Sequence, residues 1–225
     1  MDSLIALNRA STSVAVLTLN RPDRKNALSV ALRDEVTEAL ASLATDADLK
    51  TVVLTGAGSA FCAGFDLGEF QQAAGDPAFE TRLWESSDRC HEAFLTFPLP
   101  IVAAVNGPAM GGGFDTAVMC DLRTASQAAR FGHPEIVFGD VVYSPLHDLV
   151  GGAVARDLCL TGRTVSAEEA KSMGLVSTLF DASSLLAETI AIAEVIARAP
   201  RAVLQRTKAK FIARAGIEFR TTLQL

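Results

Sequence analysis

The chain has 225 residues, of which 49% are hydrophobic and 20% charged, and its formal net charge is −6. This composition predicts one sizeable globular core and excludes a disordered chain. The acidic balance argues against a general nucleic-acid-binding protein, which normally has a basic face. Residues 93–114 carry no charge, but three prolines and three consecutive glycines interrupt them, so we expect no membrane span.

The beginning of the sequence and its cysteines indicate a compartment. An acid stands at position 2, and no uninterrupted apolar segment of the kind found in secretion signals follows it. The four cysteines are scattered without a CxxC pair, and the three histidines are not spaced i, i+4. We therefore expect a cytoplasmic protein with reduced thiols and no metal site.

The predicted elements alternate between strands and helices along the chain. Residues 14–19, 51–56 and 100–107 predict strands, the latter two nearly continuous in apolar residues, as in a sheet covered on both faces. Residues 29–46 predict a helix capped by Ser29, with an apolar face made of Leu32, Val36, Leu40 and Leu43.

Later segments continue this alternation. Helices are predicted at about 80–96, 112–120 and 145–160, followed by a capping box of Ser166 and Glu169 before a short helix that ends at Gly174. A strand at 174–180 and helices at about 183–198 and from 201 onward complete the pattern. The order predicts an α/β fold with a mostly parallel sheet, in which residues 1–198 form the core and residues 199–225 a C-terminal helical segment.

Two glycine-rich turns follow predicted strands, and both bear on function. They read "LTGAGSAFCAGFDL" at 54–67 and "NGPAMGGGFDTAVMCD" at 106–121. Neither completes a GxGxxG or GxxxxGK[ST] phosphate-binding motif. Three glycines at a helix start either relieve crowding or leave backbone N–H groups open to an anion. The three glycines alone do not decide between these interpretations. The turn at 54–67 adds a second set of open N–H groups, and two N–H groups aimed at one oxygen can stabilise an oxyanion, which favours the anion-binding interpretation.

Five ordered blocks of the sequence resemble the crotonase family of enoyl-CoA hydratases and isomerases. They are "LNRPDRKNALS" (19–29), "GAGSAFCAGFDL" (56–67), "NGPAMGGGFDTAVMCDLRTAS" (106–126), "FGHPEIVFGD" (131–140) and "LTGRTVSAEEAKSMGLVSTLF" (160–180). The resemblance implies a crotonase-like core of repeated ββα units in a spiral, assembled as a homotrimer or homohexamer. It also implies an acyl-CoA or enoyl-CoA thioester substrate and no separate cofactor, since coenzyme A is part of the substrate.

The resemblance assigns the chemistry to four residues. The backbone N–H groups of Phe65 and Gly112 correspond to an oxyanion hole for the thioester oxygen. Glu135 corresponds to the principal acid/base, and Asp115 to an assisting acid where hydratases usually carry a glutamate. An apolar surround from Ile136, Val137 and Phe138 would raise the pKa of Glu135. Both acids also have a simpler interpretation, as carboxylates in a first helical turn that stabilise the helix dipole.

Further positions correspond to substrate contacts. Tyr143 stands where hydratases commonly carry a Pro-Gly stretch, and we expect either a core or lid aromatic or a hydrogen-bond donor in the pocket. A basic turn near residue 25 would bind the coenzyme A phosphates and shape the adenine side, and a second group would line the thioester entrance. The predicted substrate-binding residues are Lys25, Asn26, Ala27, Ala63, Asp66, Leu67, Gly111 and Tyr143.

Three functions follow from this pattern. The leading hypothesis is an enoyl-CoA hydratase-like lyase that acts on 2-enoyl-CoA thioesters through an oxyanion-stabilised enolate. The first alternative is a Δ3,Δ2-enoyl-CoA isomerase that uses Glu135 alone. The second is a non-catalytic acyl-CoA-binding protein. The shorter Asp115 and the bulky Tyr143 keep both alternatives open.

Overall fold

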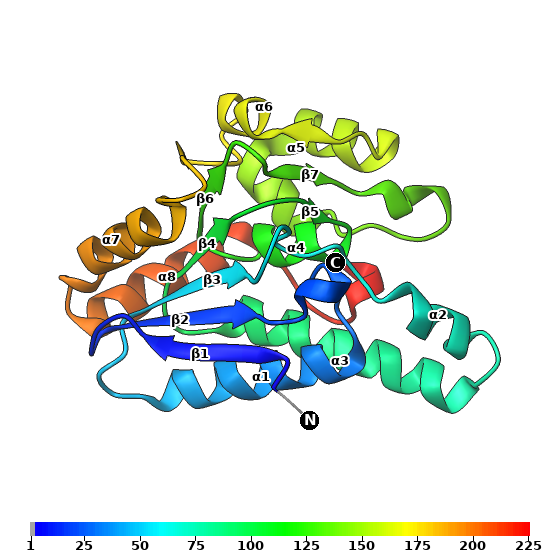
Figure 1. The fold of residues 1–225 in the computed structure, drawn as a ribbon, viewed down its shortest axis with the longest axis horizontal. Coiled ribbons are helices and arrows are strands. Elements are labelled where there is room, and N and C mark those ends of the chain that lie inside the picture. Colours follow the sequence, from blue (N-terminus) through cyan, green and yellow to red (C-terminus); the bar gives the residue numbers. More distant parts are fainter. Residues whose placement is uncertain (1–2) are drawn as a thin grey trace.

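The computed structural model describes residues 3–225 as a mixed α/β fold around one main sheet (Figure 1). The sheet has six strands in the order β1-β2-β3-β4-β6-β9. These strands are β1 (Ile5–Arg9), β2 (Val14–Leu19), β3 (Thr51–Gly56), β4 (Ile101–Val105), β6 (Leu122–Ser126) and β9 (Thr178–Phe180). Within this sheet, β1 and β2 pair antiparallel, and the other described pairs are parallel.

Both faces of the central strands β2, β3 and β4 are buried, as their apolar sequences predict. Along β2, Val14 and Val16 pack with α7 (Leu185–Ala197), whereas Ala15, Leu17 and Leu19 pack into the large core on the opposite face. Successive strand side chains point to opposite faces, so a strand covered on both sides must be apolar at every position. The predicted strands at 14–19 and 51–56 match β2 and β3 residue for residue.

Helix α1 (Val30–Thr45) lies beside α3 (Pro77–Thr96) and covers the sheet face opposite α7 (Figure 1). The Ser29 side chain accepts a hydrogen bond from the Leu32 N–H, as expected for the predicted cap. Leu32, Val36 and Leu40 are at most 1% exposed, which confirms the predicted apolar face. Short α2 (Leu67–Ala73) and strands β1 and β6 were not predicted from the sequence.

A second, smaller layer brings two distant segments together. Strand β5 (Ala109–Met110) pairs in parallel with β7 (Arg130–Gly132), with Met110 opposite Gly132. Residues that follow β5 therefore lie beside residues that follow β7. The first group begins α4 (Gly112–Val118), in the middle of the molecule, and the second forms the short 3-10 helix η2 (Pro134–Val137) (Figure 1).

The remaining elements extend this layer and return to the main sheet. They are α5 (Ser144–Thr161), β8 (Val165–Ser166), α6 (Ala167–Ser172) and α8 (Arg201–Ala215). The Ser166 side chain accepts a hydrogen bond from Glu169 N–H, as its predicted capping role requires. Lys208 of α8 is buried and donates hydrogen bonds to the Leu99 carbonyl and to Asp121. The predicted boundary between core and C-terminal segment at residue 198 stays a prediction, and no helix within residues 3–225 has the length and apolarity of a membrane span.

Candidate active site

Each glycine of the Gly111–Gly113 triplet lies where a side chain would collide with a neighbour. Gly111 has φ +52°, and a Cβ there would lie 3.0 Å from Oε2 of Glu135. A Cβ on Gly112 would lie 2.7 Å from the Phe65 ring, and one on Gly113 would lie 2.3 Å from the Cys62 carbonyl. The triplet therefore serves close packing and also brings a carboxylate and an aromatic ring against the start of α4.

Two backbone N–H groups face this packed junction without a protein acceptor. Gly112 is the first residue of α4, so its N–H has no partner within the helix. Phe65 follows Gly64, whose φ of +93° turns the chain toward α4; a Cβ on Gly64 would lie 3.4 Å from the Gly112 nitrogen. Across residues 3–225, neither the Phe65 N–H nor the Gly112 N–H has a hydrogen-bond acceptor. Such a pair can bind an oxygen that carries negative charge.

Glu135 presents a half-buried carboxylate to the same junction. Its Oε2 is buried without a hydrogen-bond partner in the described chain. Burial raises the pKa of Glu135 to about 7, against the opposing effects of a backbone hydrogen bond and of the nearby His133. A carboxyl group that titrates near neutral pH can both accept and donate a proton there.

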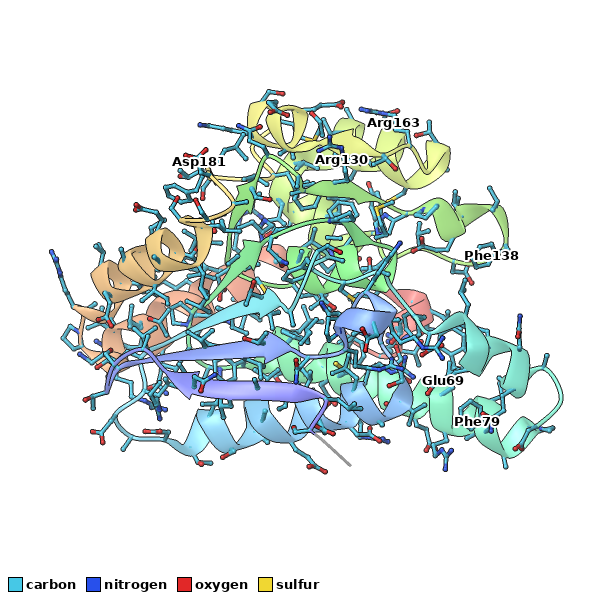
Figure 2. The ribbon with its side chains drawn as sticks, viewed as in Figure 1. Glu69, Phe79, Arg130, Phe138, Arg163 and Asp181 are labelled. Atoms are coloured by element: carbon cyan, nitrogen blue, oxygen red, sulfur yellow. The ribbon has the colours of Figure 1, made fainter. Side chains whose placement is uncertain are left out.

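The cause of this raised pKa differs in part from the sequence-based expectation. Val137 is 84% exposed and Phe138 70% exposed, and Figure 2 shows Phe138 at the outer edge of the molecule. These two side chains therefore do not form an apolar surround for the carboxylate, and that prediction is wrong. The short turn of η2 directs Glu135 inward against Gly111 and half-buried Ile136 against Gly162, while Val137 and Phe138 are exposed.

Asp115 lies one turn into α4 and is almost fully buried. Its Oδ1 is 2.7 Å from Nε2 of His133, whose side chain is completely buried. Burial by itself lowers the pKa of His133, but the charge of Asp115 and the hydrogen bond outweigh it and raise that pKa to about 10. The two residues therefore form a buried ion pair at neutral pH, and Asp115 is not a free carboxylate.

His133 was not identified as a site residue from the sequence. One oxygen or nitrogen each of Asp115, His133 and Glu135 lie within 4.8 Å of one another. A cation could use these atoms only by displacing the proton that Asp115 stabilises on His133. The sequence feature that could have identified His133 is "HPE", which follows strand β7 directly. It places His133 and Glu135 on one short turn.

The turn before α1 runs alongside the segment that carries Phe65. The Ala63 N–H donates to the Lys25 carbonyl, and the Leu28 N–H donates to the Gly64 carbonyl. Lys25, Ala63 and Leu67 are exposed, and Ala27 is half-buried, so these four can contact a ligand. Asp66 caps α2 and pairs with Arg21 at 3.0 Å, which holds the two segments together.

Asn26 corrects one predicted ligand contact. Its side chain is 0% exposed and hydrogen-bonds the backbone of Arg21, Ala57, Ala60 and Phe61. Asn26 also has φ +56°, a conformation that asparagine tolerates better than most residues. Asn26 therefore holds the turn in place, and its amide does not touch a ligand.

Tyr143 lies half-buried at the N-terminal end of α5. Its ring centroid is 5.4 Å from that of His147, and its hydroxyl lies near Gly152 of the same helix. These contacts agree with the expected core or lid aromatic.

Comparisons with known proteins assign this arrangement to a family. The model of the enoyl-CoA hydratase/isomerase family matches residues 9–224. The chain belongs to the enoyl-CoA hydratase/isomerase family. The mitochondrial enoyl-CoA hydratase of Pongo abelii is 36% identical over 201 residues, covering 87% of this chain and 68% of that protein.

Solved structures of family members have the same fold. An enoyl-CoA hydratase from Bacillus anthracis superposes with a TM-score of 0.88 at 32% identity, covering 96% of this chain and 84% of that one. A monofunctional enoyl CoA isomerase from M. smegmatis superposes with a TM-score of 0.81 at 29% identity, covering 96% and 95%. The crotonase-like fold predicted from the sequence is therefore confirmed. Members named for either reaction share this fold, so the residues of the site must discriminate between them.

The buried pair of Asp115 and His133 predicts a pH-dependent stability. Because the pKa of His133 rises from its ordinary 6.5 to about 10 on folding, its stabilising contribution is complete below pH 6.5 and is lost as pH rises toward 10. His133→Gln has no such titration. Denaturant unfolding from pH 6 to 10 should show a stability difference between wild type and variant that shrinks as pH rises. A difference that stays constant across this range would contradict the buried ion pair.

Proposed function

We propose that this protein binds an enoyl-CoA thioester and moves its double bond, with Glu135 as the single general acid/base. The observation that carries this proposal is the position of the Glu135 carboxylate. It packs against Gly111, next to two free backbone N–H groups, and has a pKa of about 7. This combination suits removal of a proton from the carbon beside a carbonyl, because charge that leaves the carbon moves onto the carbonyl oxygen.

The Phe65 and Gly112 N–H groups act as the oxyanion hole in this proposal. The thioester oxygen accepts hydrogen bonds from both, at the positive end of the α4 dipole. One such donor typically contributes about 3–4 kcal/mol to transition-state stabilisation. The missing side chain at Gly111 lets the Glu135 carboxylate approach the start of α4, and the missing side chain at Gly112 lets the Phe65 ring approach it, so the acid/base and both N–H groups lie close together.

The exposed residues near the same turns provide the contacts for coenzyme A. Lys25 and Ala63 are adjacent through their backbone hydrogen bond, and Leu67 begins α2 beyond Phe65. A lysine ammonium suits the phosphates of the coenzyme, and the small side chains Ala27 and Ala63 leave room for it to approach. The family relatives named for enoyl-CoA support this substrate class.

The proposed reaction uses one carboxylate twice. The Glu135 carboxylate removes a C2 proton from a 3-enoyl-CoA, and the electron pair moves through C1 onto the thioester oxygen to form a dienolate. Glu135 then returns the proton to C4, the electrons shift back, and a 2-enoyl-CoA results with the carboxylate regenerated. No water is consumed.

The Asp115–His133 ion pair favours isomerisation over hydration. Hydration needs a second group to hold and activate water, and the oxygen of Asp115 nearest to His133 is already hydrogen-bonded there. Hydration of 2-enoyl-CoA is the second candidate, because many relatives are named hydratases and Asp115 lies within 4.8 Å of the Glu135 carboxylate and His133. A homotrimeric or homohexameric assembly and a cytoplasmic location stay predictions from the resemblance.

Glu135→Gln tests the proposed acid/base. The variant keeps the size and polarity of the side chain but cannot take a proton, so turnover of 3-enoyl-CoA should fall roughly a hundredfold or more. In wild type, kcat/KM should rise with pH and level off above about 7, as Glu135 ionises. Glu92→Gln on the exposed surface of α3 is the matched control. Full activity in Glu135→Gln would refute the assignment, and wild-type binding without turnover of any enoyl-CoA would favour the binding-protein alternative.

Asp115→Asn separates the two reactions. If only hydration uses Asp115 to hold water, the variant should lose any hydration of 2-enoyl-CoA while it retains isomerisation of 3-enoyl-CoA within a few-fold. Both substrates are assayed under the same conditions, with thermal unfolding as a check on folding. Equal losses in the two reactions would show that Asp115 serves both, contrary to a single-carboxylate mechanism.

A further inference from the structure

A buried arginine lies directly behind the ring of Phe65. Arg33 belongs to α1 and is 1% exposed, and its Cζ lies 4.6 Å from the centroid of the Phe65 ring. The same ring also contacts Gly112, because a Cβ on Gly112 would lie 2.7 Å from ring atom Cε2. The Phe65 ring is therefore in contact with both Arg33 and the start of α4.

The guanidinium of Arg33 hydrogen-bonds both α3 and the turn before α1, the two segments that flank Phe65. It donates to the Leu28 carbonyl at 2.8 Å, to the Leu83 carbonyl at 3.1 Å and to the Ser86 hydroxyl at 3.3 Å. Leu28 in turn hydrogen-bonds both neighbours of Phe65, since its N–H donates to Gly64 and its carbonyl accepts from Asp66. A substitution at Arg33 would therefore alter the orientation of the Phe65 N–H through a single intervening residue, Leu28.

The positive charge of Arg33 is not neutralised by direct contact. Among residues 3–225, no carboxylate forms an ion pair with it. The nearby acids are engaged elsewhere: Asp34 accepts from Ser86 and Arg89, and Glu69 accepts from the N–H of Val30. Figure 2 shows Glu69 close to the start of α1. A buried charge without a contacting counter-charge is costly to fold, so the hydrogen bonds of Arg33 must offset that cost.

We infer that Arg33 is a positioning residue for the oxyanion hole, which fixes the Phe65 N–H and places positive charge behind it. The inference rests on the proposed function of the Phe65 and Gly112 N–H groups. As negative charge develops on the thioester oxygen, the nearby buried charge of Arg33 acts on it in a medium that screens less than water. A purely structural Arg33 would tie α1 to α3 and have no effect on the bound thioester.

Arg33→Met and a matched variant, Arg123→Met, distinguish these roles. Arg123 is also buried and donates to backbone carbonyls, those of Leu175, Cys120, Ala117 and Asp121. Each variant removes a buried guanidinium from three or four carbonyl or hydroxyl contacts, so both should lower the melting temperature. Arg33→Met alone should reduce kcat for 3-enoyl-CoA, by roughly tenfold, with KM changed by less than about threefold, because the lost interaction forms mainly in the transition state.

A spectroscopic measurement tests the same point without turnover. A conjugated 2,4-dienoyl-CoA absorbs at longer wavelength when hydrogen bonds polarise its carbonyl. The red shift on binding should decrease in Arg33→Met and stay at the wild-type value in Arg123→Met. Arg33→Lys, which keeps the charge but not the planar fork, should recover part of the shift and serves if the methionine variant does not fold.

The outcomes separate this inference from the proposed function. An unchanged red shift and kcat in both Arg33 variants, beside a wild-type protein that shows the shift, would overturn the role of Arg33 and leave the proposed function intact. A wild-type protein that binds dienoyl-CoA without any red shift would overturn the oxyanion hole itself, and the role of Arg33 with it.

Discussion

The site depends on the close contact between the start of α4 and the segment that carries Phe65. Both Gly112 and Gly113 must lack a side chain for this contact, since a Cβ would meet the Phe65 ring or the Cys62 carbonyl. The contact brings the free N–H groups of Phe65 and Gly112 close together, and the parallel pairing of β5 with β7 brings Glu135 against Gly111 at the same place. Backbone donors held by packing are already oriented before substrate binds, which is the basis of electrostatic catalysis.

Charge distribution then divides the site into distinct roles. Glu135 is half-buried with a free oxygen, so its pKa lies near 7, whereas Asp115 is neutralised by His133. The two carboxylates therefore differ in their surroundings: Asp115 pairs with His133, and Oε2 of Glu135 has no partner among the described residues. Different surroundings give the acids of other enzymes different roles in the same way. One buried imidazole thus occupies the nearer oxygen of Asp115 and leaves Oε2 of Glu135 without such a partner, and the proposed single-carboxylate reaction rests on that difference.

Local sequence patterns predicted most of the fold. Strands β2 and β3 were predicted exactly because a doubly covered strand is apolar at every position, and the caps at Ser29 and Ser166 were correct because capping is a local interaction. Strand β6 escaped prediction because its sequence, "LRTAS", mixes a buried arginine with small polar residues that hydrogen-bond only through tertiary contacts.

The sequence predicted only those site residues that belong to recognisable family motifs. The positions of Phe65, Gly112 and Glu135 follow from motif spacing, and the structure brings them together. Asn26 was misassigned and His133 and Arg33 were missed, because a polar residue in a sequence does not reveal whether it faces solvent or a buried partner. Those three depend on contacts between residues 18 to 53 positions apart.

The central claim is that Glu135 and the two N–H groups together form an enolate from a bound thioester. Incubating a 3-enoyl-CoA with the wild-type protein in D2O and following it by proton NMR tests this most directly. The resonances of the 3-enoyl thioester should be replaced by those of the 2-enoyl thioester, with no oxygen added and with any deuterium taken up confined to C2 and C4. Saturating binding with neither conversion to the 2-enoyl thioester nor exchange at C2 or C4 would contradict the claim.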